Sequence, residues 1–539
     1  MRSITLAGLA GALLSAGGAT IASADTRNIG AAWSAPLRVR LAQEPDLLLP
    51  HATGMAVARD VSMLIHAGLW RRNPEGAWDA DLAASPPKLR AHGGHWEASV
   101  VLARGRRWHD GQPVRAADVV ATWRYLKDVR RARVLDRAVL DHLVRVEARG
   151  EDRVTAVFDR ALAAWPAAFE AIYPAHLLVQ PDRWRRAERE PVGAGPYRLA
   201  EWQPGLRLLL QPVKQRGARP LQLEIVPDDG AAVVRMMAGD LDVMPAVPGP
   251  MLERVGALPG VLIRRKDTIS VEAIVFDLGH PVLGDRAVRE ALTLAVDRRL
   301  LARSAWAGLA RPAETDRAIG AGLAARVWAG PPDPVAAKHL LDRSGWRPGP
   351  DGVRVRRGLR LTVPLVMPTS RRPREAMALA IRAMWTRLGV DVRLEPIHPS
   401  RFFAVGGPLS RPGYGAALWS WEQDPDGDVR NMWRSDRRPP VGGNVSGVAD
   451  PELDRWLDAA AAELNGAARQ ATLDRISARL RRHAVLLPLV TPAQAWGCPD
   501  SLTGCGPRPW SALGNPWTWS PAEVQKDSGA SVPQASWMR

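Results

Sequence analysis

The pair His109–Asp110 is the first place in this sequence where side chains could perform acid–base chemistry. It stands in the stretch 107–123, RWHDGQPVRAADVVATW. A histidine oriented by a carboxylate is a common general base, but adjacent residues in an extended segment tend to point apart. Asp110-Gly111 also favours a turn, and Asp118 puts negative charge near the start of a helix. We therefore predict a turn that leads into a helix, and no catalytic dyad.

Two other motifs suggest ligand chemistry, and each has a simpler explanation. His92 and His95, in AHGGHW, could form a metal pair, but glycines separate them and no carboxylate is adjacent, which predicts a surface hairpin. The segment 193–197, GAGPY, has the glycines of a phosphate loop without the lysine and the helix that such a loop needs. We predict a framework role for it, with a hinge or a ligand contact as alternatives. With no nucleophile, base and orienting group in sight, the chain is predicted not to be an enzyme and to carry no cofactor or metal.

Cys498 and Cys505, in WGCPDSLTGCG, are the two cysteines of the chain. In an oxidising compartment a small disulfide loop is favoured over two free thiols, which remain the alternative. A disulfide here would be a local structural link.

The first residues have the layout of a secretory signal peptide. Arg2 supplies the positive charge, Ile4–Leu14 is a short apolar run, and Ala22-Ser23-Ala24 fits a cleavage site. No cysteine lies near that site, so a lipid anchor is not expected. The sequence therefore predicts export to the periplasm after removal of residues 1–24.

The net charge of +17 raises nucleic acid or anionic lipid as partners. Arginine supplies most of the positive charge, however, and it is scattered along the whole chain without a basic block. No nucleic-acid partner is predicted.

The hydrophobic pattern alternates between strands and helices in two separate blocks, which predicts an α/β fold with two lobes. The stretches 37–50 and 95–108 have strand character, and 54–69 has apolar residues at helical spacing. The stretch 285–306 is predicted to be one amphipathic helix.

Several motifs, in a consistent order from about residue 37 to residue 495, resemble the family 5 extracellular solute-binding proteins, which serve ABC importers of peptides, nickel and haem. They include WHDGQPVRAADVVATW, PVGAGPYRLAEWQPG, AGDLDVM, VREALTLAVDRRLL and WSWEQDPDGDVRNMW. The resemblance implies a bilobal periplasmic-binding-protein type II fold with an extra small α/β domain. It also implies the following ranges: domain I in 25–55, 176–268 and 483–539, domain II in 56–175, and domain III in 269–482.

The resemblance places the ligand cleft at LWSWEQDPDGD. Peptide-binding members have an acidic residue here that pairs with the peptide's amino group, but counting from Asp424 puts Trp421 at this position. A small gap would bring Glu422 into register. Trp419 and Trp421 share one face of a strand and could stack on a ligand, with core packing as the alternative. His66 stands where the family often has an aromatic residue near the cleft, and Arg401 and Phe402 are further candidates for the border of the cleft.

We therefore expect a monomeric periplasmic protein that binds a small ligand, a peptide or peptide-like compound, and delivers it to an ABC permease and ATPase. Closure of the lobes would bury the ligand. The alternatives are the same fold with a nickel complex, haem, a sugar or a cationic compound, a ligand sensor, and a secreted hydrolase.

Overall fold

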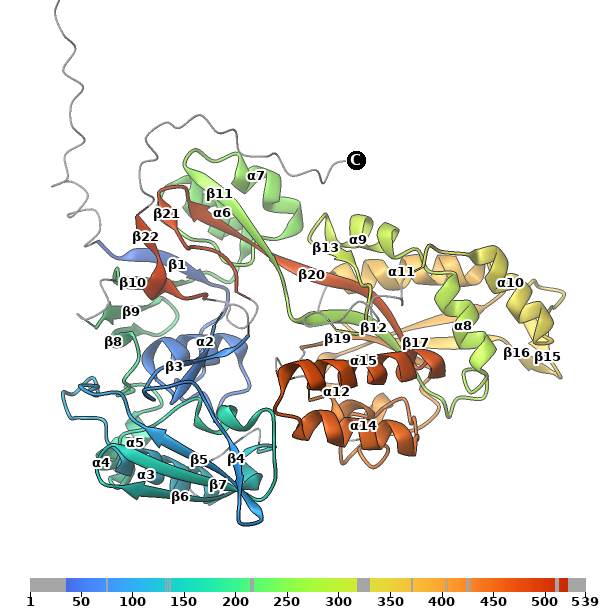
Figure 1. Cartoon of the computed structure of the whole chain (residues 1–539). Coiled ribbons are helices and arrows are strands. Elements are labelled where there is room, and N and C mark those ends of the chain that lie inside the picture. The colour runs from blue at the N-terminus through green and yellow to red at the C-terminus, as the bar shows by residue number, and fades with distance from the viewer. Residues whose placement is uncertain are drawn as a thin grey trace, which may run out of the picture.

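The computed structural model describes residues 35–521 except for 74–75, 131, 133, 135–136, 214–217, 318–329, 370–371, 403, 405, 423–425, 427 and 509–512. The predicted signal peptide lies outside the described residues. Two lobes stand side by side, and two long strands connect them (Figure 1). Each lobe mixes helices and sheets, as the hydrophobic pattern predicts.

The first domain is built on a four-stranded sheet in the order β1-β10-β9-β8, with β1 parallel to β10. Its core contains apolar side chains from this sheet and from the returning C-terminal segment. The strands are β1 (Leu37–Leu41), β8 (Tyr197–Gln203), β9 (Arg207–Pro212) and β10 (Leu221–Ile225), and the helices are α2 (Ala56–Ile65), α6 (Asp229–Met237) and α7 (Leu252–Gly256).

The second domain is inserted between β1 and β8 and lies at the lower end of the first lobe in Figure 1. An antiparallel sheet in the order β4-β5-β7-β6 packs against helix α3. Its elements are β2 (Trp70–Arg72), β3 (Trp78–Ala80), β4 (Arg90–His92), β5 (His95–Val101), β6 (Leu143–Arg149), β7 (Arg153–Phe158), α3 (Ala116–Lys127), η2 (Trp165–Phe169), α4 (Ala175–Leu178) and α5 (Pro181–Arg186).

The second lobe has a mixed sheet that is covered by helices on both faces. Two separate apolar clusters, one on each face, fill the space between the sheet and the helices. The strands are β12 (Ser270–Phe276), β13 (Ala310–Pro312), β17 (Thr362–Pro368), β18 (Asp391–Ile397) and β19 (Ala416–Glu422), with short β14 (Arg347–Pro348), β15 (Arg354–Arg356) and β16 (Leu359–Arg360). The helices are α8 (Arg286–Leu294), α9 (Arg298–Trp306), α10 (Pro334–Arg343), α11 (Arg372–Thr386), α12 (Pro399–Phe402), α13 (Arg430–Trp433), α14 (Pro451–Ala462) and α15 (Gly466–His483).

The single helix predicted for 285–306 is wrong, because the structure has two helices there. Helix α8 ends at Leu294, and Asp297 caps the start of α9 by accepting a hydrogen bond from the backbone N–H of Leu300 at 2.9 Å. An aspartate side chain that binds a free backbone N–H favours a helix start over a helix interior. The continuous apolar pattern hid this break.

Two strands connect the lobes. Strand β20 (Leu486–Pro499) pairs with β12 at its beginning and with β11 (Val261–Asp267) at its end, so one strand belongs to both lobes. The chain crosses a second time between β11 and β12, where the backbone N–H of Thr268 donates to the Pro492 carbonyl at 2.9 Å. Within the described residues, the chain passes from one lobe to the other only at these two adjacent places. Rotation of one lobe against the other therefore has its hinge there.

The cores differ from two predicted domain limits. Val61, Leu64 and Ile65 of α2 pack in the core of the first domain, although residue 56 was predicted to begin the second domain. Helices α4 and α5 pack in the core of the second domain, although 176 was predicted to begin the return to the first. Both differences arise because tertiary packing, which the local sequence pattern does not reveal, assigns a helix to one core or the other.

The C-terminal segment after β20 folds back onto the first lobe. Cys498 and Cys505 form a disulfide with an S–S distance of 2.12 Å. Within the described residues, no helix has the length and the apolar character needed to cross a membrane.

Candidate functional site

The segment around His109 and Asp110 forms a turn that leads into a helix, as predicted. Gly111 has a φ of +90°, and α3 starts at Ala116 with the Asp118 carboxylate accepting from the backbone N–H of Arg115 at 2.8 Å. His109 Nε2 lies 3.1 Å from the Gly195 carbonyl oxygen, whereas Asp110 contacts His176 at 2.7 Å. The side chains of His109 and Asp110 therefore contact different partners and do not form a dyad. His109 links the second domain to the segment 193–195.

The other two motifs are structural as well. His92 and His95 flank a surface turn between β4 and β5. Gly193 and Gly195 lie against the end of α2, and a Cβ atom on Gly193 would be 1.9 Å from the Ile65 carbonyl oxygen. No cluster of three or more metal-binding side chains occurs among the described residues.

His66 lies in the core between the first two domains. It is 1% exposed, its Nε2 donates to the Leu48 carbonyl at 2.9 Å, and its ring packs edge-on against Tyr173. Burial lowers the pKa of His66 to about 4 and that of His51, on the other side of Tyr173, to about 3. Both rings are therefore neutral in the folded protein at neutral pH.

These buried histidines predict a loss of stability in mild acid. Because their pKa values are lower in the folded than in the unfolded chain, the unfolded chain binds more protons below pH 6.5. Between pH 6.5 and its pKa in the folded protein, each histidine should lower the free energy of unfolding by about 1.4 kcal/mol per pH unit. We expect the urea midpoint to fall steeply from pH 6.5 to pH 4.5, and less so in His66→Gln. The surface variant His95→Gln is the control, and an unchanged slope in His66→Gln would contradict the assignment.

Trp419 is a core residue of the second lobe. It is 6% exposed and packs against Phe402, with ring centroids 6.1 Å apart. The sequence left two interpretations of Trp419 open, stacking on a ligand and packing in the core. The contacts of Trp419 support core packing. Arg401, beside Phe402 in α12, is exposed.

Strand β19 ends within the expected ligand segment. Trp421 and Glu422 are its last two residues and pair through the backbone with Val271 and Ser270. Their side chains and the whole of Asp424 lie outside the described residues. Asp426 lies within the described residues, and its side chain makes a contact between the lobes.

Asp426 joins the two lobes. Its carboxylate lies 2.5 Å from Nη2 of Arg72, on β2 of the first lobe, and both side chains are largely buried. The Arg72 guanidinium stacks on the Trp78 ring at 3.9 Å, which holds it in place for the ion pair. A backbone hydrogen bond from Ala163 to the Ala461 carbonyl, at 2.8 Å, also joins the lobes. The structure is therefore that of lobes in contact.

Beside this contact lies a pocket with a volume of about 560 Å³, lined by the chain around His51, the start of α2, and the end of η2. Glu170 and Arg59 place opposite charges in its wall. The Glu170 side chain reaches solvent, but protein crowds it from both lobes, and the loss of hydration raises the pKa of its carboxyl group. The charges of Arg59, Arg72 and Arg71 oppose this rise, while that of Asp426 adds to it.

Among the described residues, no side chain forms a hydrogen bond or an ion pair with the Glu170 carboxylate. A pocket of this size, with a few charged groups in a mostly apolar wall, suits a small ligand. Sequence analysis missed Glu170 and Arg72, because no motif marks either residue.

Residues 80–439, more than half of the chain, match the family described as bacterial extracellular solute-binding proteins, family 5 (middle region). The chain belongs to this family. The resemblance inferred from the ordered motifs is therefore confirmed. As a family 5 solute-binding protein, it is the component of an ABC importer that captures the solute.

Relatives of this solute-binding protein extend the match. Protein XP55 from Streptomyces lividans is 29% identical over 470 residues, which cover 85% of this chain and 84% of the relative. The oligopeptide-binding protein AppA of Bacillus subtilis is 24% identical over 328 residues, or 55% of this chain and 57% of AppA.

Solved structures of other family 5 proteins share the fold. NikA from Brucella suis, in complex with Fe(III)-EDTA, superposes with a TM-score of 0.78 at 19% identity, over 90% of this chain and 100% of NikA. AppA from Bacillus subtilis, in complex with a nonapeptide, has a TM-score of 0.71 at 19% identity, over 91% of this chain and 99% of AppA. The α/β bilobal fold predicted for the chain is thereby confirmed.

Proposed function

We propose that this protein binds a peptide or peptide-like solute between its lobes and delivers it to the permease and ATPase of an ABC importer. Peptide-binding relatives such as AppA support the ligand class. In this proposal the protein is a monomer, reaches the periplasm through a cleavable signal peptide, and has no enzymatic activity. Binding and release would depend on rotation about the two crossing strands.

The observation that carries the peptide assignment is the exposed Glu170 carboxylate in the pocket of about 560 Å³ that Arg59 also lines. A carboxylate and a guanidinium in one pocket suit a zwitterion, whose amino group and carboxyl group need opposite partners. In the proposal, Glu170 takes the ligand's amino group, and Glu422 and Asp424 contribute from the other lobe. Trp421 stays a candidate for stacking on the ligand, as the sequence predicts, whereas Trp419 and His66 are buried in the protein core.

The test is a thermal-shift and calorimetric screen of the mature protein with alanine peptides of two to five residues. A peptide at 100 times its dissociation constant should stabilise the protein by roughly 2.7 kcal/mol. Peptides with an acetylated amino end should give no shift. A shift with nickel–histidine, Fe(III)-EDTA or haem, without one for any peptide, would replace the ligand class and keep the solute-binding function.

Glu170→Gln is expected to weaken binding of the free-amino peptides at least tenfold, because a charge-assisted hydrogen bond is lost. Glu253→Gln is the matched control, since Glu253 is an exposed carboxylate on α7, away from the pocket. Equal affinities in the two variants would remove Glu170 from the site.

Peptide affinity should also depend on pH in a direction set by Glu170. The raised pKa of its carboxyl group means that it takes up a proton at a higher pH than an ordinary glutamate. The protonated form does not attract an ammonium group, so affinity should decline as the pH falls through this raised pKa. Calorimetry from pH 7.5 to pH 4.5 measures this decline, and Glu170→Gln should flatten it.

A further inference from the structure

The pocket beside Glu170 combines two charged side chains with an apolar wall. Among the lining residues that the structure describes, Glu170 and Arg59 carry charge, and His51 is neutral because burial lowers its pKa to about 3. Much of the remaining lining is aliphatic and comes from the second domain. The members of this apolar wall are Leu126, Val139, Leu140, Ala167, Ala168 and Ala171.

The apolar wall rests on a packed core. Leu126 belongs to α3 and Leu140 begins the short helix η1 (Leu140–His142), and both side chains are buried in the core of the second domain. Val139 and Ala171 pack against the same core and remain partly buried. A wall that is already held by its neighbours costs a ligand little free energy to order.

Part of the apolar wall adjoins the Glu170 carboxylate in the chain. The backbone N–H of Glu170 donates to the Ala167 carbonyl at 3.3 Å, which closes one turn at the end of η2. Ala167, Ala168 and Ala171 therefore lie within one turn of Glu170. Their small side chains leave room for a ligand group next to the carboxylate.

Tyr173 connects Glu170 with the part of the wall that α3 supplies. Tyr173 lines the same pocket, burial raises the pKa of its phenol, and the Glu170 charge adds to this rise. The Tyr173 and Tyr125 rings have their centroids 6.5 Å apart, and Leu126 follows Tyr125 in α3. The carboxylate and the apolar wall thus border one space.

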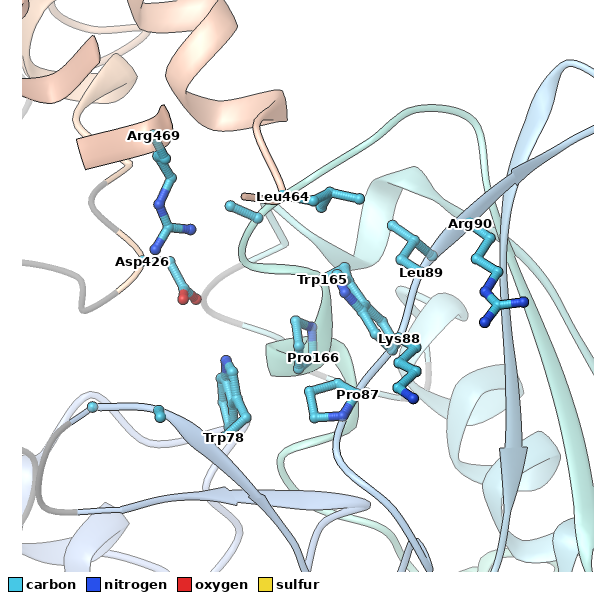
Figure 2. A pocket seen from close by; sticks show the side chains of 13 residues that line it. Trp78, Pro87, Lys88, Leu89, Arg90, Trp165, Pro166, Asp426, Leu464 and Arg469 are labelled. Carbon is cyan, nitrogen blue, oxygen red and sulfur yellow. The ribbon is translucent and has the colours of Figure 1, made fainter. Parts of the chain in front are cut away.

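Helix η2 also borders a second pocket, where the two lobes meet. Trp165 and Pro166 of η2 line this second pocket together with Asp426 of the other lobe (Figure 2). The loss of hydration raises the pKa of the Glu170 carboxyl group, and the Asp426 charge adds to the rise, so the two carboxylates are near each other. A peptide with its amino end at Glu170 can therefore continue past η2 toward the contact between the lobes.

We propose that the apolar wall binds the side chain of the ligand's first residue, so that the protein prefers peptides that begin with leucine, isoleucine or valine. This inference rests on the proposed peptide function. The first side chain and the amino group are attached to the same carbon atom, so an amino group at Glu170 brings that side chain into the same pocket. An aliphatic side chain gains there from leaving water, whereas a polar one loses hydration without a partner.

The experiment compares the tetrapeptides LAAA, NAAA, AAAA and AAAL by isothermal titration calorimetry. Asparagine has nearly the shape of leucine without its apolar character, and AAAL has the composition of LAAA with leucine at the other end. We expect wild type to bind LAAA about tenfold more tightly than each of the other three, because most of the leucine side chain is buried.

Two substitutions in the apolar wall are expected to remove this preference. Val139→Asn makes the wall polar, and Ala168→Leu fills part of the space, so both should weaken LAAA more than AAAA. Val144→Asn is the matched control, because Val144 is 50% exposed on β6 and does not line the pocket. It should keep the full preference for LAAA.

The outcomes separate this inference from the peptide function. If wild type binds LAAA and AAAL equally, or if both wall variants keep the preference, the inference is overturned and peptide binding stands. If no peptide binds, isoamylamine, which has the side chain and amino group of leucine without its carboxyl group, is titrated instead. Isoamylamine binding that Val139→Asn weakens supports the apolar subsite and rejects the peptide function, whereas no binding overturns both.

Discussion

Gly193→Ala is expected to destabilise the protein by about 4 kcal/mol, at the upper end of single substitutions. The new Cβ would lie 1.9 Å from the carbonyl oxygen and 2.6 Å from the carbonyl carbon of Ile65. Both atoms are backbone atoms of α2, so relief requires the two domains to separate. That movement would break the 2.8 Å hydrogen bond from Gly195 to Ile65 and the contacts of His109 with this segment.

Urea unfolding and the yield of folded protein measure this effect. Gly466→Ala is the matched control, because a Cβ there meets no atom within 4 Å and the residue lies at the start of α15. This control should be neutral or slightly stabilising. A urea midpoint for Gly193→Ala close to that of Gly466→Ala would mean that the two domains pack less tightly at Gly193 than these distances indicate.

Asp426→Asn is expected to weaken ligand binding about thirtyfold, which corresponds to about 2 kcal/mol. With the lobes together, Asp426 and Arg72 are both largely buried and 2.5 Å apart. The amide leaves the guanidinium buried without its counter-charge, whereas separated lobes let water solvate it. The substitution therefore destabilises the closed state selectively.

Calorimetry measures the affinity, and small-angle X-ray scattering of the ligand-free protein should show a larger radius of gyration for Asp426→Asn. Asp428→Asn is the control, because Asp428 pairs with Arg430 inside the second lobe at 2.8 Å. The double variant Arg72→Met/Asp426→Leu should recover part of the affinity, since replacing both charges leaves none unpaired. Unchanged scattering and affinity in Asp426→Asn would mean that the ion pair does not hold the lobes together.

The local segments that the sequence predicts correctly have their stabilising interactions within a few residues. The turn at Asp110-Gly111, the start of α3 with Asp118, and the hairpin between His92 and His95 are of this kind. The same reasoning failed at α8 and α9, where an apolar face continues across a break that Asp297 caps. Hydrophobic period alone does not distinguish one helix from two that share a buried face.

By itself, the sequence determined the α/β class, the two blocks that become lobes, and the family, because each rests on patterns repeated along hundreds of residues. Only the tertiary structure decided which charged side chains meet where the lobes are in contact. Arg72 and Asp426 are 354 residues apart in the chain, and Glu170 stands in no motif. Arg72 and Asp426 form an ion pair only because the lobes bring them to 2.5 Å from each other. Electrostatic coupling depends on distance and hydration in space, and the local order of residues specifies neither.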